Sequence, residues 1–210
     1  MNKELEQRAY QFEWRAEESG VIIGRPVVFN SRTDIGYFDE VIEQGALDKT
    51  DLNDVRLCLN HDTSYVYARS RRNNPASTMQ LRVDAEGLTM EARLDIENSP
   101  KARDLYSAVR RGDLDGMSFM FSVDGDEWEN LDSEHPLRHI RSIASIVEVS
   151  AVTFPAYDAT SIQARSKDAL ESARALLESE ARSVEKPVET GIDLETLKLK
   201  TIILTGGKVR

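Results

Sequence analysis

Three polar side chains of this chain stand in or beside segments that are otherwise apolar, and their types suit acyl-transfer chemistry. His61 follows one apolar run, Ser118 lies within a second, and Glu148 lies within a third. Hydrolysis through an acyl-enzyme needs a hydroxyl nucleophile, an imidazole that acts as general base, and a carboxylate that orients the imidazole. If the fold brings the three residues together, the chain is a serine protease. If it does not, the chain is an ordinary soluble α/β domain.

Each of these residues, considered alone, also has a structural explanation. His61 can cap a loop, and Ser118 can form a local hydrogen bond. Glu148 can face solvent from a half-exposed strand, although a carboxylate in so apolar a stretch is costly to bury unless it is paired. Alternation places Glu148 on the same strand face as Ser150 and opposite Val149, so this face could carry it toward an imidazole. Ser118 does not lie in a Gly-x-Ser-x-Gly elbow, which disfavours an α/β-hydrolase.

A metal site is a second chemistry that the sequence offers. His135 and His139, together with Glu134 or Glu127, have part of the spacing of zinc ligands. Pro136 would break a helix at this place, and neither a cysteine nor a third histidine lies near in the sequence. A metal-dependent hydrolase therefore remains the weaker alternative. The sequence contains no phosphate-binding loop and no dinucleotide fingerprint.

The composition argues against a nucleic-acid-binding protein, a disulfide-linked protein and a membrane protein. The net charge of −10 disfavours non-specific binding to nucleic acid, which needs a basic surface. The single cysteine, Cys58, cannot form an intrachain disulfide, as is usual in a reducing compartment. The sequence has no apolar run long enough to span a membrane, and its charged N-terminus lacks the apolar core of a signal peptide. We therefore expect a cytoplasmic protein.

Apolar periodicity predicts the elements that must position these residues. Strands are expected over residues 21–29, 55–59, 117–123 and 143–154, together with a hairpin over residues 79–94. A first helix, over residues 99–112, is predicted by Ser99 at the N-cap, Pro100 at the first helical position and Gly112 after the last turn. The spacing of apolar residues predicts a second helix over residues 168–181.

The motifs around the three polar residues, taken in order, resemble the caudoviral prohead proteases, the capsid-maturation serine proteases that are distantly akin to the herpesvirus assemblins. The resemblance covers roughly residues 18–165 and includes the segment from Phe38 to Leu47. It rests on three motifs, which are Leu59-Asn60-His61-Asp62, Gly112-Asp113-Leu114-Asp115-Gly116-Met117-Ser118-Phe119 with Phe121, and Ile146-Val147-Glu148-Val149-Ser150-Ala151-Val152-Thr153-Phe154-Pro155-Ala156-Tyr157.

The resemblance implies roles for the three polar residues. It implies that His61 is the general base and Ser118 the nucleophile, and that Glu148 is the third member, which orients His61. The sequence departs from the family at residues 65–68, which are bulkier than the usual glycine-containing turn after the histidine. This departure affects the expected shape of the substrate groove rather than the triad.

The resemblance also implies a fold and a division of the chain. It implies an α+β fold, in which a mostly antiparallel β-barrel is flanked by helices. We expect a frayed N-terminal segment over residues 1–17, a protease domain over residues 18–165, and a helix on or after that domain over residues 166–182. Residues 183–210 are expected to form a linker over residues 183–191 and a C-terminal tail over residues 192–210, and this tail would dock on a scaffold or be cleaved by the protease itself.

The implied function is that of a bacteriophage endopeptidase of virion morphogenesis. Its substrates would be the scaffolding segment of the major capsid protein, or a separate scaffold, and the protease itself by autoproteolysis. It would act in the host cytoplasm inside the immature prohead, as a possible homo-oligomer and without a metal or cofactor, and it would be absent from the mature virion. The alternative is a non-catalytic barrel that serves as a capsid scaffold or interaction protein.

Overall fold

The structure is a computed structural model of the 210-residue chain, and it describes residues 4–11, 14–17, 20–153 and 159–184. Residues 1–174 form one compact unit and residues 175–210 form a second. All strands and the first helix belong to the first unit. The predicted tail over residues 192–210 lies outside the described residues, as does the predicted linker except for its first two positions. None of the described helices is long and apolar enough to cross a membrane.

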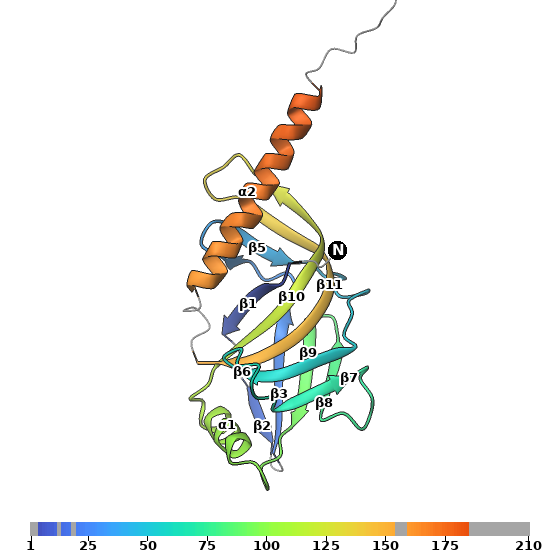
Figure 1. The fold of residues 1–210 in the computed structure, drawn as a ribbon, viewed down its shortest axis with the longest axis vertical. Helices are drawn as coiled ribbons and strands as arrows, with labels where there is room; N and C mark the ends of the chain where they lie inside the picture. The colour runs from blue at the N-terminus through green and yellow to red at the C-terminus, as the bar shows by residue number, and fades with distance from the viewer. Residues whose placement is uncertain (1–3, 12–13, 18–19, 154–158, 185–210) are drawn as a thin grey trace, which may run out of the picture. The chain divides into compact units, whose positions relative to one another are not determined.

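Eleven strands and two helices make up the described part of the chain (Figure 1). In chain order they are β1 (Glu6–Gln11), β2 (Arg15–Glu17), β3 (Val21–Val28), β4 (Thr33–Asp34), β5 (Asp39–Ile42), β6 (Asp54–Leu59), β7 (Ala68–Arg71), β8 (Met79–Val83), β9 (Gly87–Arg93), α1 (Pro100–Arg111), β10 (Gly116–Glu129), β11 (Leu137–Val152) and α2 (Ala159–Val184). The fold is therefore of the α+β class and consists mostly of strands, as the sequence predicted.

The strands form two sheets. The larger sheet has the order β1-β10-β11-β5-β4, with β6 on β11 and β7 on β6, and the smaller sheet has the order β2-β3-β9-β8. The long strands β10 and β11 run side by side and curve through the molecule, with β1 beside β10 (Figure 1). Shifts of register between Met120 and Asp126 interrupt their pairing, and such bulges allow a pair of strands to bend.

The prediction of a closed barrel was wrong, although most of the strand pairs are antiparallel, as expected. β5 and β6 both pair with β11 in parallel, so the larger sheet is mixed, and no sheet of the described residues closes on itself. Local alternation is the same in an open sheet and in a barrel, because it reports only which face of a strand is buried. The pairing of strands far apart in the sequence decides closure and direction.

The prediction of a frayed segment over residues 1–17 was also wrong where the structure describes this segment. Residues 6–11 form β1 on the edge of β10, and residues 15–17 form β2 on the edge of β3. The division into domains that was expected from the sequence remains a prediction.

The predicted hairpin and first helix are confirmed. β8 and β9 pair as an antiparallel hairpin. The Ser99 side chain accepts a hydrogen bond from the backbone N–H of Ala102 at the start of α1, and Pro100 is the first residue of the helix. Gly112 ends the helix with a positive φ of 74°, a conformation that costs glycine little. The second helix, α2, begins earlier than predicted, at Ala159.

The core lies between the two sheets and beneath α1. β10 alternates strictly near its start, so that Met117, Phe119 and Phe121 are buried in the core while Ser118 lies on the opposite face. A Cβ atom at Gly24 of β3 would lie 2.5 Å from the sulfur of Met117. The absence of a side chain at Gly24 therefore lets the smaller sheet approach β10 next to Ser118.

Candidate active site

Three adjacent strands bring the predicted site residues together. In the pairing of β10 with β11, Ser118 lies opposite Ser150 and Met120 lies opposite Glu148. β6 lies on the other side of β11, where Cys58 is the partner of Ser150. Ser118, Glu148 and Ser150 therefore share one face of the sheet, and the end of β6 delivers the next residues of the chain to the same place.

His61 enters the site from a tight turn at the end of β6. Asn60 and His61 both have positive φ angles, 50° and 58°, a conformation that is uncommon outside glycine. The turn is held by backbone and side-chain contacts with the end of β11. The backbone N–H of Asn60 donates to the carbonyl of Ala151 at 2.9 Å, and the backbone N–H of Thr153 donates to Asn60 Oδ1 at 2.9 Å. These bonds fix the direction in which the imidazole leaves the backbone.

The imidazole of His61 lies between the other two predicted residues. Its Nε2 is 2.7 Å from Oγ of Ser118, and its Nδ1 is 2.6 Å from Oε2 of Glu148. Both partners are buried, and the His61 side chain is 12% exposed. If Nδ1 donates its proton to the carboxylate, Nε2 is left as an acceptor that faces the hydroxyl. This is the geometry that a hydroxyl nucleophile, its base and an orienting carboxylate require.

Ser150 is a further member of the site that the sequence analysis did not assign. Its hydroxyl donates to Oε1 of Glu148, the oxygen that does not face His61, and accepts from the backbone N–H of His61 at 3.0 Å. Both oxygens of the buried carboxylate therefore have partners. The signal in the sequence is the alternation that places Ser150 on the same strand face as Glu148.

The thiol of Cys58 lies near the site without the properties of a nucleophile. Burial, and after it the charge of Glu148, raise the pKa of the Cys58 thiol to about 12. The thiol is therefore protonated at neutral pH, and only the thiolate is a strong nucleophile. The buried Cys58 is therefore a small residue of the core.

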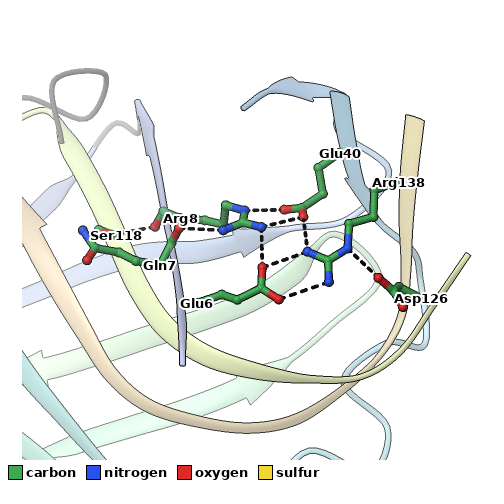
Figure 2. Close-up of polar contacts among 7 residues, drawn as sticks. All are labelled: Glu6, Gln7, Arg8, Glu40, Ser118, Asp126 and Arg138. Atoms are coloured by element: carbon green, nitrogen blue, oxygen red, sulfur yellow. Dashed lines mark hydrogen bonds and ion pairs between the residues drawn. The ribbon is translucent and has the colours of Figure 1, made fainter. Parts of the chain in front are cut away.

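The strand β1 covers Ser118. Ala9 lies opposite Ser118 in the pairing of β1 with β10. The backbone carbonyl of Arg8 accepts a hydrogen bond from Oγ of Ser118 at 2.7 Å, and Ser118 is completely buried. Figure 2 shows that the Arg8 side chain extends away from Ser118, toward Glu40.

A buried ionic cluster anchors β1 at this position (Figure 2). The guanidinium of Arg8 donates to both oxygens of Glu40 and to Oε2 of Glu6. Arg138 of β11 donates to Glu40, to Glu6 and to Asp126. Arg8 also lies over the ring of Phe121, 5.4 Å from its centroid. The cluster comprises Glu6, Arg8, Glu40, Asp126 and Arg138.

The charges in this cluster stabilise one another. Burial by itself would raise the pKa of Glu6, but the charges and hydrogen bonds of Arg8 and Arg138 outweigh it and lower that pKa. Burial by itself would lower the pKa of Arg8, but the charge and hydrogen bonds of Glu40 outweigh it and raise that pKa. Glu6 and Arg8 are therefore both charged at neutral pH.

The two histidines of the predicted metal site contact different carboxylates. His139 contacts Glu43 through Nδ1 at 2.6 Å, whereas His135 contacts Asp39 through Nε2 at 3.1 Å. Asp34 completes a small group with His135 and Asp39. Within this group, the carboxylate of Asp39 already forms an ion pair with Arg32, which lies outside the group. The group of possible metal ligands found in the described residues contains His135 but not His139.

A groove of about 500 Å³ opens beside the turn that carries His61. Asp62, Tyr65, Tyr67 and Thr153 are among the residues that line it. These two tyrosines pack edge to face with their ring centroids 4.8 Å apart, and the Tyr65 hydroxyl bonds to Ser99 at the start of α1. The bulky residues that follow the histidine therefore shape this groove.

Comparison with known proteins gives one family. The family model of the Caudovirus prohead serine protease matches residues 3–174. No curated protein and no solved structure matches the chain. Because the matched region spans most of the chain and contains all the strands described above, the chain belongs to the caudovirus prohead serine protease family.

Proposed function

We propose that Ser118, His61 and Glu148 form the catalytic triad with which this serine protease of prohead maturation hydrolyses peptide bonds. The observation that carries the proposal is the position of the His61 ring, which has the Ser118 hydroxyl at 2.7 Å on one side and the Glu148 carboxylate at 2.6 Å on the other. Membership of the family supports the reaction class.

In the first half of the proposed reaction, Oγ of Ser118 attacks the scissile carbonyl carbon, while Nε2 of His61 takes the hydroxyl proton. The resulting imidazolium is stabilised by the carboxylate of Glu148 at Nδ1. When the tetrahedral intermediate collapses, the C–N bond breaks, and the imidazolium returns its proton to the leaving amine. The product of this half is an ester between the substrate and Ser118.

In the second half, water replaces the leaving amine. His61 takes a proton from the water as it attacks the ester carbonyl, and it returns that proton to Oγ of Ser118 when the ester bond breaks. Ser150 acts as a positioning residue, because its hydroxyl holds the oxygen of Glu148 that does not face His61 and also accepts from the backbone of His61.

The proposed substrates are proteins of the assembling shell. Family membership implies capsid or scaffold proteins as the substrates, and we propose the scaffolding segment of the major capsid protein, or a separate scaffold, together with the protease itself. The site of action would be the interior of the immature prohead in the host cell. The proposal that residues 192–210 dock on a scaffold or are removed by self-cleavage also stands as a prediction.

The test is labelling of Ser118 by a serine-directed phosphonate, measured by mass spectrometry alongside cleavage of capsid and scaffold. Only an activated serine reacts with such a reagent. We expect the wild type to be labelled at Ser118, and the Ser118→Ala variant neither to be labelled nor to process its substrates. Normal processing by Ser118→Ala would refute the assignment. Absence of both labelling and substrate processing in the wild type would favour a non-catalytic interaction protein.

A further inference from the structure

We infer that β1 occupies the place of the substrate's strand, and that a substrate binds by replacing β1 on the edge of β10 with a basic residue in the position of Arg8. This inference rests on the proposed function, because it takes Ser118 as the nucleophile. It adds to that function a binding mode, a residue preference and a step that must precede catalysis.

The first argument is the register of the strands. β1 runs antiparallel to β10, and its residues 6–11 lie opposite residues 116–121, a stretch that contains Ser118. The other edge of β10 pairs with β11 over these same residues. Within the described parts of the chain, the edge now occupied by β1 is therefore the one on which an extended peptide could add a strand beside Ser118.

The second argument is the group that meets the nucleophile. The backbone carbonyl of Arg8 lies 2.7 Å from Oγ of Ser118, which is completely buried. Arg8 directly precedes Ala9, the residue of β1 that lies opposite Ser118. A substrate strand in the place of β1 would present its scissile carbonyl at the position of the Arg8 carbonyl. The Arg8–Ala9 bond is thus the counterpart of the scissile bond, and Arg8 is the counterpart of the residue that precedes it.

The third argument is the number of protons. The Ser118 hydroxyl has one proton, yet two acceptors lie 2.7 Å from its oxygen, namely Nε2 of His61 and the carbonyl of Arg8. A proton donated to Arg8 is not available to His61. With β1 in place, the carbonyl of Arg8 therefore competes with the general base for the proton that catalysis must transfer, and departure of β1 ends this competition.

The fourth argument concerns the buried carboxylate that β1 would leave behind. Glu40 is 1% exposed and receives two hydrogen bonds from Arg8. Without β1 it would keep the contact with Arg138 at 3.2 Å, while Oε1 would lose its donor. A buried carboxylate that loses a charged partner is strongly destabilised. A substrate with arginine or lysine at this position would restore the partner, so Glu40 selects a basic residue directly before the cleaved bond.

The anchoring of β1 is compatible with exchange. β1 pairs with β10 alone among the described strands. Besides the contact of Arg8 with Glu40, β1 is held by Glu6, which bridges Arg8 and Arg138. The side chain of Glu6 is 15% exposed. Glu6 does not contact Ser118, His61 or Glu148 in any hydrogen bond described above. Its removal should therefore loosen β1 without altering the nucleophile or its base.

A reversible crosslink tests the displacement of β1. Gln7 and Met120 lie directly opposite each other on β1 and β10, so the double variant Gln7→Cys/Met120→Cys can form a disulfide across the two strands. We expect the oxidised form to react with the phosphonate at least about tenfold more slowly than the same protein after reduction. The single variants Gln7→Cys and Met120→Cys are the controls and should be insensitive to oxidant.

The outcomes of this experiment separate the inference from the proposed function. Equal labelling rates before and after reduction, with the crosslink verified by mass, would overturn the inference and leave the proposed function standing. Absence of labelling in both the wild type and the Glu6→Gln variant, together with absence of substrate processing, would instead overturn the proposed function, and the inference with it.

A second variant, which is expected to raise the labelling rate, distinguishes displacement of β1 from a general loss of structure at the site. Glu6→Gln removes the bridging charge and should raise the labelling rate of Ser118 by a fewfold, whereas a purely structural role of β1 predicts no change or a decrease. A decrease in a variant whose circular dichroism is unchanged would count against the inference.

The preference for a basic residue is tested with the chain's own segment as a peptide. A synthetic peptide of residues 4–11, added at millimolar concentration to the Glu6→Gln variant, should protect Ser118 from the phosphonate. The matched peptide with Arg8→Gln should protect at least about tenfold less well, because it leaves the buried Glu40 without a partner. Equal protection by both peptides would overturn the proposed preference.

Discussion

Asn60 and Thr153 bind each other where strands β6 and β11 end. The backbone N–H of Thr153 donates to Oδ1 of Asn60 at 2.9 Å, and Nδ2 of Asn60 donates to Oγ1 of Thr153 at 3.0 Å. Asn60 precedes His61 and has a φ of 50°. This pair therefore fixes both the conformation and the position of the turn that carries the imidazole.

Substitution of Asn60 should lower activity more than stability. We expect Asn60→Ala to reduce kcat/KM by about tenfold or more, because a small displacement of the imidazole disturbs proton transfer. Asn60→Gly loses the same side-chain bonds but accepts the positive φ, so it should lie between Asn60→Ala and the wild type. Rates of peptide hydrolysis, together with thermal melting curves, check this order. Equal activity of all three proteins would contradict the proposed role.

Substitution of Ser150 should impair the orientation of Glu148. Ser150→Ala leaves Oε1 of the buried Glu148 without the hydroxyl donor, and an unsatisfied buried acceptor costs about 1–3 kcal/mol. We expect kcat to fall and the pH dependence of kcat to shift, while KM changes little. The control is Ser122→Ala, which breaks a serine pair between the same two strands, with Ser145, away from His61. If both substitutions had a similar effect, Ser150 would contribute only to packing and not to the orientation of Glu148.

Substitution of Glu148 tests the third position of the proposed triad. Glu148→Gln keeps the shape of the side chain but can donate a proton toward Nδ1 of His61, which favours the tautomer that cannot accept the Ser118 proton. A loss of roughly 10³-fold or more in kcat is expected for such a change. Single-turnover hydrolysis and phosphonate labelling measure it. Retention of nearly full activity would show that another group orients His61.

The docking of β1 should weaken in acid through Glu6. The pKa of Glu6 is lowered in the folded protein, against an ordinary value of 4.5, because the charges of Arg8 and Arg138 outweigh the effect of burial. A lowered folded pKa adds stability that is complete above the ordinary value and is lost as the pH falls through the folded pKa.

This acid dependence can be assigned by comparison with Glu6→Gln. Other carboxylates with a lowered pKa, such as Asp54 and Asp84, add to the acid sensitivity of the wild type. The difference in melting temperature between the wild type and Glu6→Gln isolates the contribution of Glu6. We expect this difference to be constant well above the ordinary pKa of 4.5 and to shrink as the pH falls below it. A difference that does not depend on pH would contradict the assignment.

The parts of the fold that were predicted correctly are those with local causes. The ends of α1 follow from Ser99 and Gly112, and the hairpin of β8 and β9 follows from alternation on either side of a short turn. The mixed sheet could not be predicted, because the parallel pairing of β5 and β6 with β11 joins segments that lie about a hundred residues apart. Nothing in the local pattern of these segments specifies their partners.

The same distinction applies to β1 and to the site. The charges of Glu6 and Arg8 suggested a solvated end of the chain. Their partners Glu40 and Arg138 are distant in the sequence, and in the fold Arg8 is buried against Glu40 while Glu6 is paired with Arg138. The residue types at His61, Ser118 and Glu148 were visible in the sequence. The carbonyl of Arg8 was not, since every residue has a backbone carbonyl and only the register of β1 brings this one to Ser118.

Because β1 belongs to the same chain as the site that it covers, it sets the substrate concentration that is needed to replace it. A segment tethered to its own binding site competes with free peptides as if it were present at an effective concentration, which is on the order of millimolar for a short flexible connection. A substrate that must replace β1 therefore binds well only when its own local concentration approaches that value. Dilute substrate would be left intact, whereas substrate packed at high density around the protease would be cleaved.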